Sequence, residues 1–183
     1  MKAEIIDYKT ENIPLIAERL KRGEVGIFPC DTIYGICACV GEESAERIYE
    51  IKHRPQSKSF IELMTKSDID RRGLMVDEEL LSRWPAPFTA IVKNSEGSTT
   101  AVRVPSDEFL QDLLKLTGPI YSTSVNYSGE MSLLTFDDIL PVFEDSVDFI
   151  VRHPNLVPGQ SSTLINAIEK PYKVIRQGKY QFD

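Results

Sequence analysis

The order of apolar runs and amphipathic stretches along the chain restricts the folds that it can adopt. In the first half, strand-like apolar runs at residues 24–29 and 35–40 alternate with amphipathic stretches such as residues 42–53, where apolar residues recur at helical spacing. In the second half, strand-like runs follow one another more often. Alternating strands and helices are typical of α/β proteins, whereas consecutive strands favour antiparallel pairs. We therefore predict an α/β fold with a mixed sheet and flanking helices.

The boundaries of these elements follow from periodicity and from residues that end helices. Gly23 and Gly118 follow two of the helical stretches, and Pro55 prevents a third from continuing. The expected helices cover residues 12–23, 42–53, 68–73, 77–84, 107–118 and 135–143. The expected strands cover residues 3–8, 24–29, 35–40, 60–64, 88–93, 99–104, 119–124, 147–151, 162–167 and 172–178.

Chain length and hydrophobic content predict one domain over residues 1–183. Of the 183 residues, 42% are hydrophobic, which is enough for a sizeable core. No apolar run approaches the length of a membrane span, and the first residues, MKAEIIDYKTEN, lack the apolar core of a signal peptide. We therefore expect a cytoplasmic protein that has no membrane association.

The sequence offers little material for a metal site built from side chains. Cys30, Cys37 and Cys39 lack the paired spacing of zinc ligands, and His53 and His153 are far apart in the sequence. Cysteines in apolar runs are commonly buried as small hydrophobic residues. We therefore expect buried, reduced cysteines and no metal ligated by the protein.

A cluster of cations interrupts a chain that is acidic overall. The formal net charge is −7, yet Lys52, His53, Arg54 and Lys58 lie in one short segment. Two interpretations stand. Cations at the end of a helix complement its dipole. Alternatively, the segment forms an anion site, which is favoured by Lys58 because that residue lies beyond Pro55 and cannot serve the helix.

A second polar cluster follows directly upon an apolar strand. Residues 122–129 read STSVNYSG and include Ser124 and Asn126. Strand ends that open into Ser, Asn and Gly place hydroxyls and backbone N–H groups at the sheet edge, where α/β proteins bind ligands. The same residues also form ordinary turns, so both interpretations remain open.

Three further polar residues lie beside or within apolar runs. Thr32 belongs to the turn at residues 29–35, where its hydroxyl serves either the turn or a small ligand. Arg103 and Arg176 lie inside strand-like runs. An arginine in such a run either faces solvent or is buried against an anion.

Taken in order, these segments resemble the YrdC family of threonylcarbamoyl-AMP synthases. The turn FPCDTIYGI is similar to that family's strand-turn element, and Lys52-x-Arg54 with Ser124-x-Asn126 is similar to its K-x-R and S-x-N signature. Each segment alone is weakly specific, but the ordered series is specific. The resemblance spans most of the chain and continues at residues 83–89, 101–105, 122–129, 161–166 and 174–178.

The resemblance implies a single-domain YrdC-like fold, in which a twisted mixed sheet with flanking helices encloses a deep basic cleft. It also implies a reaction in which L-threonine, bicarbonate and ATP give threonylcarbamoyl-AMP and pyrophosphate. A Mg²⁺ ion would arrive on the ATP phosphates. Other proteins, the tRNA threonylcarbamoyl transferases, would then modify the adenosine at position 37 of tRNA. The chain ends at QGKYQFD, so we expect it to lack the extra C-terminal domain of longer relatives.

The resemblance also implies roles for individual residues. Lys52 and Arg54 would hold the ATP phosphates, and Ser124 and Asn126 would contact the nucleotide from the opposite side. Arg176 would join the phosphate or ribose side of the site. The threonine pocket would be lined by Thr32, Arg103 and Ser162, with Arg103 as the partner of the threonine carboxylate.

Three alternatives to the synthase remain from the sequence. An RNA-binding protein could use the same basic cleft, although an acidic chain is opposite to the usual charge of such proteins. A paralogue that binds nucleotide but uses another substrate is kept open by departures from the family pattern. These departures are Ser59, Leu63, Ala86 and Val125, of which the last two predict a tighter pocket. A scaffolding protein would explain the fold but not the polar strand ends.

Overall fold

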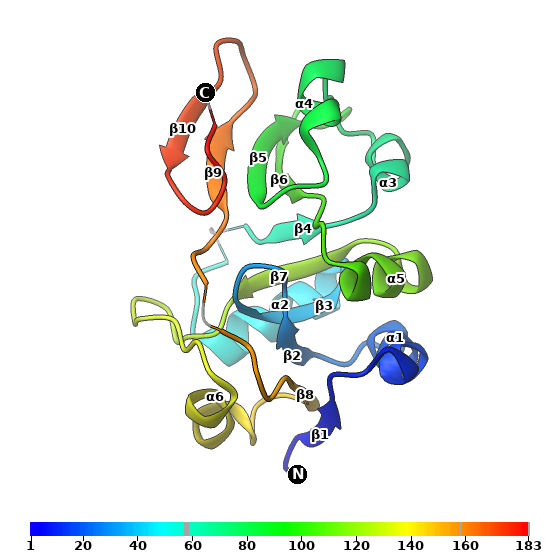
Figure 1. Cartoon of the computed structure of the whole chain (residues 1–183), viewed down its shortest axis with the longest axis vertical. Helices are drawn as coiled ribbons and strands as arrows, with labels where there is room; N and C mark the ends of the chain where they lie inside the picture. The colour runs from blue at the N-terminus through cyan, green and yellow to red at the C-terminus, as the bar shows by residue number, and fades with distance from the viewer. Residues whose placement is uncertain (57–58, 158, 183) are drawn as a thin grey trace.

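The computed structural model describes residues 1–56, 59–157 and 159–182. Its centre is a ten-stranded mixed sheet with the strand order β1-β8-β2-β3-β7-β4-β6-β5-β9-β10 (Figure 1). The strands are β1 (Glu4–Asp7), β2 (Gly26–Pro29), β3 (Tyr34–Cys39), β4 (Ile61–Leu63), β5 (Phe88–Lys93), β6 (Thr99–Arg103), β7 (Ile120–Ser124), β8 (Phe149–Arg152), β9 (Thr163–Asn166) and β10 (Lys173–Arg176).

The sheet combines parallel and antiparallel pairs, as the order of elements predicts. Strand β8 pairs in parallel with both β1 and β2, whereas β3 pairs antiparallel with β2 and β7. Strand β4 lies between β7 and β6 and joins the two halves of the sheet. Segments distant in sequence therefore end beside one another near the middle of the molecule.

Helices cover both faces of the half of the sheet that contains β2 and β3. The helices are α1 (Ile13–Lys21), α2 (Glu42–Lys52), α3 (Lys66–Arg71), α4 (Glu78–Arg83), α5 (Glu108–Thr117) and α6 (Phe136–Phe143), and a 3₁₀ turn covers Thr10–Asn12. Helices α1 and α5 pack with Phe28 in one cluster, and α2 and α6 pack with Ile27 in another. Neighbouring residues of β2 thus enter opposite clusters, which explains why this strand is apolar throughout.

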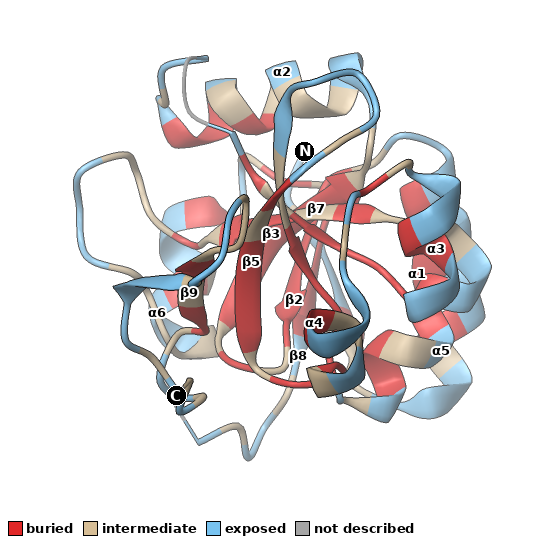
Figure 2. Cartoon of the chain, turned by 90° about the horizontal axis from the view of Figure 1, so that it is seen from above, coloured by how far each residue is buried: buried red, intermediate tan, exposed pale blue. Residues whose placement is uncertain are grey.

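A third cluster supports the other half of the sheet. It joins α3 and α4 to β5, β6 and β9 around Trp84 and Phe88, whose rings stack at 4.9 Å. Figure 2 shows the buried strands at the centre and helices with exposed outer faces around them. Among the described residues, no helix has the length and apolar character needed to cross a membrane.

The predicted fold class is confirmed, and the predicted helices and strands are found within a few residues of their expected ends. The cysteine prediction holds in part. All three cysteines are free, and Cys30 and Cys37 are buried with their Sγ atoms 3.4 Å apart, but Cys39 is only half-buried. Cys39 is the last residue of β3 and packs at the margin of one apolar cluster.

Candidate active site

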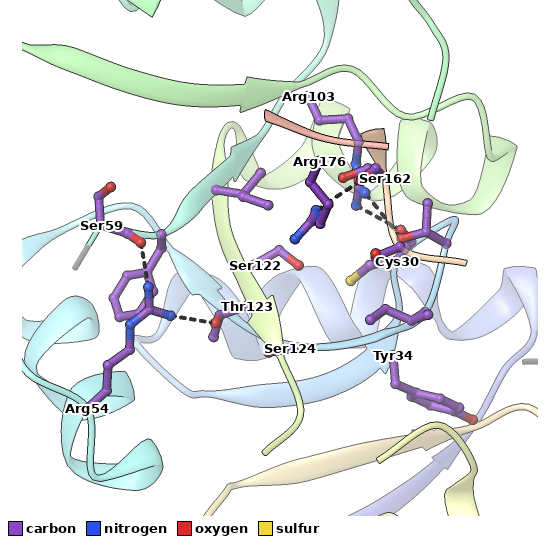
Figure 3. A pocket seen from close by; sticks show the side chains of 15 residues that line it. Cys30, Tyr34, Arg54, Ser59, Arg103, Ser122, Thr123, Ser124, Ser162 and Arg176 are labelled. Atoms are coloured by element: carbon purple, nitrogen blue, oxygen red, sulfur yellow. Dashed lines mark hydrogen bonds between the residues drawn. The ribbon is translucent and has the colours of Figure 1, made fainter. Parts of the chain in front are cut away.

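A cavity of about 220 Å³ lies where β3, β7 and the ends of β4, β6 and β10 meet (Figure 3). Three arginines reach it from different elements, and several hydroxyls surround them. None of the described residues that line it carries a carboxylate. The lining residues are Cys30, Thr32, Ile33, Tyr34, Arg54, Ser59, Phe60, Ile61, Arg103, Ser122, Thr123, Ser124, Ser161, Ser162 and Arg176.

Arg103, the last residue of β6, is buried in the wall of this cavity with 3% of its surface exposed. Its Nη1 donates to Thr32 Oγ1 at 3.2 Å, and its Nη2 donates to the Cys30 carbonyl at 2.9 Å. Within the described part of the chain its Nε has no hydrogen-bond partner and no carboxylate forms a salt bridge with it. Burial lowers the pKa of the guanidinium. A buried charge without a counter-ion indicates a site for an anion.

Arg176, the last residue of β10, reaches the same cavity from the side opposite Arg54 (Figure 3). Its Nη2 donates to the Ser162 carbonyl at 2.9 Å. The Ser162 side chain is buried, and its hydroxyl lies 2.8 Å from that of Thr89. The apolar run around Arg176 is β10, an exposed strand at the edge of the sheet, and the arginine side chain faces the cavity.

Arg54 lies two residues beyond the end of α2 and closes the third side of the cavity. Its Nη1 donates to Thr123 Oγ1 at 3.0 Å, its Nη2 donates to the Ser59 carbonyl at 2.8 Å, and its guanidinium lies 5.0 Å from the centre of the Phe60 ring. Its buried Nε has no partner among the described residues. Burial lowers the pKa of this arginine also.

Lys52, the last residue of α2, is buried with 2% of its surface exposed. Its ammonium donates to the Ser124 carbonyl and, at 2.8 Å, to Asn126 Oδ1. The Ser124 hydroxyl also donates to Asn126 Oδ1, at 2.7 Å. Burial and the neighbouring charge of Arg54 lower the pKa of Lys52 to about 7. Its partners among the described residues are uncharged oxygens, so a bound anion would favour the charged form of this amine.

A second cavity, of about 190 Å³, continues from the first. Arg54 and Ser124 line both cavities, and Lys52, Asn126, Ser128 and Gly129 complete the second. The two loops that form it are tied together, because the Ser128 N–H donates to the Lys52 carbonyl at 2.8 Å. The end of α2 and the end of β7 therefore build one polar recess.

The structure brings the eight candidate residues into these two adjoining cavities. Lys52, Arg54, Ser124 and Asn126 line the second, while the first is lined by Arg54, Ser124, Thr32, Arg103, Ser162 and Arg176. Lys58 lies outside the described residues. His53 is exposed and stacks on Tyr127, with ring centres 4.8 Å apart, so it does not join the cation cluster.

The four departures from the family pattern do not all reach the site. Ser59 lines the first cavity, but Leu63, Ala86 and Val125 are buried in the apolar clusters and are not among its lining residues. Ser122 and Thr123, which also line the first cavity, belong to the polar cluster expected at residues 122–129. The carbonyl groups of Cys30, Ser59 and Ser162, which accept hydrogen bonds from the three arginines, were not foreseen. Every residue type carries a main-chain carbonyl, so the sequence does not indicate which of them will contact a site.

Lys52 and three arginines converge on two cavities at strand ends of this α/β protein, and no carboxylate lies among the described residues that line them, an arrangement suited to a polyanionic ligand. A family model described as "Telomere recombination", which covers Sua5, YciO and YrdC proteins, matches residues 18–178. Because this match covers most of the sequence, the chain belongs to the Sua5/YciO/YrdC family.

Two relatives and one further structure illustrate the similarity. The chain is 28% identical over 182 residues to the threonylcarbamoyl-AMP synthase of Pyrococcus abyssi, covering 91% of this chain and 54% of that protein. The crystal structure of P. abyssi Sua5 complexed with L-threonine matches with a TM-score of 0.84 and 27% identity, over 97% of this chain and 58% of that one. E. coli YciO shares the fold, with a TM-score of 0.80 and 23% identity over 97% and 94% of the two chains. The chain thus spans about half the length of the curated relative that it matches.

Proposed function

We propose that this protein is a nucleotidyltransferase that forms threonylcarbamoyl-AMP and pyrophosphate from L-threonine, bicarbonate and ATP. The observation that carries the proposal is the convergence of Lys52 and Arg54 with Ser124 and Asn126 beside a cavity lined by two more arginines. The P. abyssi relatives named as a threonylcarbamoyl-AMP synthase and as a Sua5 complex with L-threonine support it.

The second cavity would hold the triphosphate. Lys52 and Arg54 supply positive charge there, and the hydroxyl and amide of Ser124 and Asn126 supply polar contacts. Since no carboxylate lines either cavity among the described residues, a Mg²⁺ ion would be held by phosphate oxygens and water rather than by the protein. Such an ion would neutralise phosphate charge when bound.

The first cavity would hold the amino acid. The guanidinium of Arg103 is a suitable partner for its carboxylate, and the hydroxyls of Thr32 and Ser162 lie nearby as donors or acceptors for its polar groups. Arg176 would contact the phosphate or ribose where the two ligands meet. These groups position and neutralise charge, which is the main requirement of nucleotidyl transfer.

In the proposed reaction the amine of threonine combines with bicarbonate to give a carbamate and water. A carbamate oxygen then attacks the α-phosphorus of ATP, the bond to the bridging oxygen breaks, and pyrophosphate leaves. The buried cations would offset the charge that develops on the leaving group. Where the first cavity limits the access of water, it would slow hydrolysis of the resulting mixed anhydride.

The product would serve tRNA modification in the cytoplasm, through downstream threonylcarbamoyl transferase proteins and with at most weak direct binding of tRNA by this chain. The test is pyrophosphate release by the purified protein with ATP, bicarbonate and each amino acid in turn. Release that requires threonine supports the proposal. Release that requires a different amino acid would identify a paralogue. If no amino acid stimulates pyrophosphate release, the proposal is overturned.

Alanine variants test the phosphate assignment separately. Lys52→Ala and Arg54→Ala should each lower threonine-dependent pyrophosphate release at least about a hundredfold, because each removes a charge from the triphosphate site. Far-UV circular dichroism should show that both variants remain folded. Unchanged turnover in either variant would remove that residue from the phosphate site.

A further inference from the structure

Two loops of the site contain residues with unusual backbone geometry. Among the described residues, Asp31 and His53 are the non-glycine residues with positive φ, at 68° and 51°. A left-handed backbone is uncommon for side chains other than glycine, although Asp tolerates it better than most. Such residues persist where surrounding contacts hold them, and they cluster at functional sites.

The Asp31 carboxylate holds its loop to a second segment. Asp31 Oδ2 accepts from the Ser106 N–H at 3.0 Å and from the Ser106 hydroxyl at 3.2 Å. Ser106 lies three residues after Arg103 in the chain. We call this pair of contacts the Asp31–Ser106 latch.

The latched loop in turn fixes the direction of Arg103. The guanidinium has two hydrogen-bond partners among the described residues, namely the Cys30 carbonyl and the Thr32 hydroxyl on either side of Asp31. Because no carboxylate pairs with Arg103 in the described chain, these two oxygens decide where its free Nε and cavity face point. A shift of the loop would therefore redirect the arginine.

Asp31 itself does not line the cavity that contains Arg103. It lines a neighbouring cavity of about 320 Å³, together with Ser106, Asp107, Tyr8 and His153, and the two cavities share Cys30, Thr32 and Ile33. Asp31 can therefore act on a ligand beside Arg103 through the position of this loop, in addition to the Coulombic effect of its charge on the guanidinium.

We propose that Asp31 is a positioning residue for the amino-acid half of the reaction. The latch holds residues 30–32 against the chain that follows Arg103, and so directs the guanidinium at the substrate carboxylate. This inference rests on the proposed function for its kinetic test. Its structural test, given below, does not depend on that function.

Three substitutions separate the latch from backbone strain. Asp31→Gly removes the carboxylate and relieves the left-handed backbone, whereas Asp31→Ala removes the carboxylate and keeps the strain. Asp31→Asn keeps both an acceptor oxygen and tolerance of positive φ, and it is the matched control. An effect that Gly and Ala share, and that Asn does not, reports the latch.

The kinetic readout is the split between the two substrates. Asp31→Gly and Asp31→Ala should raise KM for L-threonine about tenfold, the size expected for one lost hydrogen bond to a charged group. KM for ATP should stay within about twofold, and Asp31→Asn should restore KM for threonine. An unchanged KM for threonine in the Gly and Ala variants, or an equal rise in both KM values, would overturn the proposal.

Hydrogen exchange gives the readout that is independent of activity. Amides in residues 30–34 and the Ser106 amide should exchange faster in the Gly and Ala variants than in the natural protein and in Asp31→Asn. Equal exchange rates in all four proteins would overturn the latch. If the natural protein releases no pyrophosphate with threonine, the proposed function fails, and the exchange rates alone decide whether the latch exists.

Discussion

At the scale of single residues, the surroundings of Arg103 say most about the ligand. A buried arginine is ordinarily paired with a carboxylate, since an isolated charge in a protein interior is strongly disfavoured. Arg103 has only a hydroxyl and a carbonyl oxygen as partners among the described residues. Its charge therefore destabilises the folded protein, and a bound carboxylate would offset this destabilisation.

Removing the charge of Arg103 should therefore affect folding stability and substrate binding in opposite directions. Arg103→Met should leave the melting temperature unchanged or raise it, because an apolar side chain of similar length replaces an unpaired buried charge. Threonine-dependent pyrophosphate release should fall at least about tenfold, as expected when a charged hydrogen bond to substrate is lost. Thermal unfolding and steady-state kinetics measure the two effects. A sharp fall in melting temperature would instead make Arg103 a structural residue.

Lys52 makes a second prediction at this scale. Burial and Arg54 lower the pKa of its ammonium to about 7, so in the free protein the charged form is lost as pH rises through that value. If the charged form pairs with phosphate as proposed, the dissociation constant for a non-hydrolysable ATP analogue should increase between about pH 6 and about pH 9.

The matched control for this pH dependence is Lys52→Arg, which stays charged throughout the range. Calorimetric titrations of the natural protein and of the variant should diverge above about pH 7. Parallel binding curves for the two proteins would show that the protonation of Lys52 does not control nucleotide binding.

At the scale of elements, the site depends on how the end of α2 meets the end of β7. The Ser128 N–H donates to the Lys52 carbonyl at 2.8 Å. The ring of Tyr127 stacks on His53, with ring centres 4.8 Å apart, and lies tilted against Phe143, with ring centres 5.0 Å apart. These contacts join the loop that carries Lys52 and Arg54 to the loop that carries Asn126. They explain how side chains far apart in the sequence keep a fixed separation.

Tyr127 tests this connection between the loops. Tyr127→Ala should raise KM for ATP roughly twofold to tenfold, which corresponds to the value of one or two aromatic contacts. Tyr127→Phe keeps the stacked ring and should behave like the natural protein. If both variants bind ATP normally, the stack does not position the phosphate site.

The segment after β10 provides a second test at the element scale. A Cβ atom at Gly178 would lie 2.3 Å from the Ser161 carbonyl oxygen and 2.6 Å from the Ser162 carbonyl carbon. Gly178→Ala must therefore displace the backbone at Ser162, whose carbonyl accepts the hydrogen bond from Arg176. We expect a loss of about 1–3 kcal/mol in the free energy of unfolding, as for other overpacked sites.

Urea denaturation measures this loss, and Gly41→Ala is the control. A Cβ atom at Gly41 would have no neighbour within 4 Å, so that variant should lose only the roughly 0.5–1 kcal/mol expected when Ala replaces Gly at a helix N-cap. Equal stability of the two variants would mean that the close approach at Gly178 is relieved without cost.

At the scale of the whole molecule, a net charge of −7 coexists with a site that is lined by arginines and, among the described residues, by no carboxylate. The acidic exterior would oppose nucleic acid, whereas the recess would still attract a small anion. Strand β4 joins the halves of the sheet beside the cavity, whereas the described acidic residues are exposed or half-buried apart from Glu62 and Asp68.

Much of this arrangement could be predicted from the sequence. Apolar periodicity located the helices and strands. The cations at the end of α2 and the polar residues after β7 each left a structural and a ligand-binding interpretation open, and only the resemblance to the YrdC family favoured a phosphate site. Strand register could not be predicted, because it depends on pairings such as β4 with β7 that no local pattern encodes. The carbonyl groups that orient Arg103 and Arg176 could not be predicted either, since every residue type carries one.

The central claim is that the two adjoining cavities hold ATP and a carboxylated amino acid together. The most direct test supplies the purified protein with ATP, L-threonine and ¹³C-labelled bicarbonate and identifies the nucleotide product by mass spectrometry. The expected product is an adenylate that contains both threonine and the labelled carbon. This adenylate should not form when threonine is omitted. Formation of AMP and pyrophosphate with no labelled adenylate, or no consumption of ATP at all, would contradict the central claim.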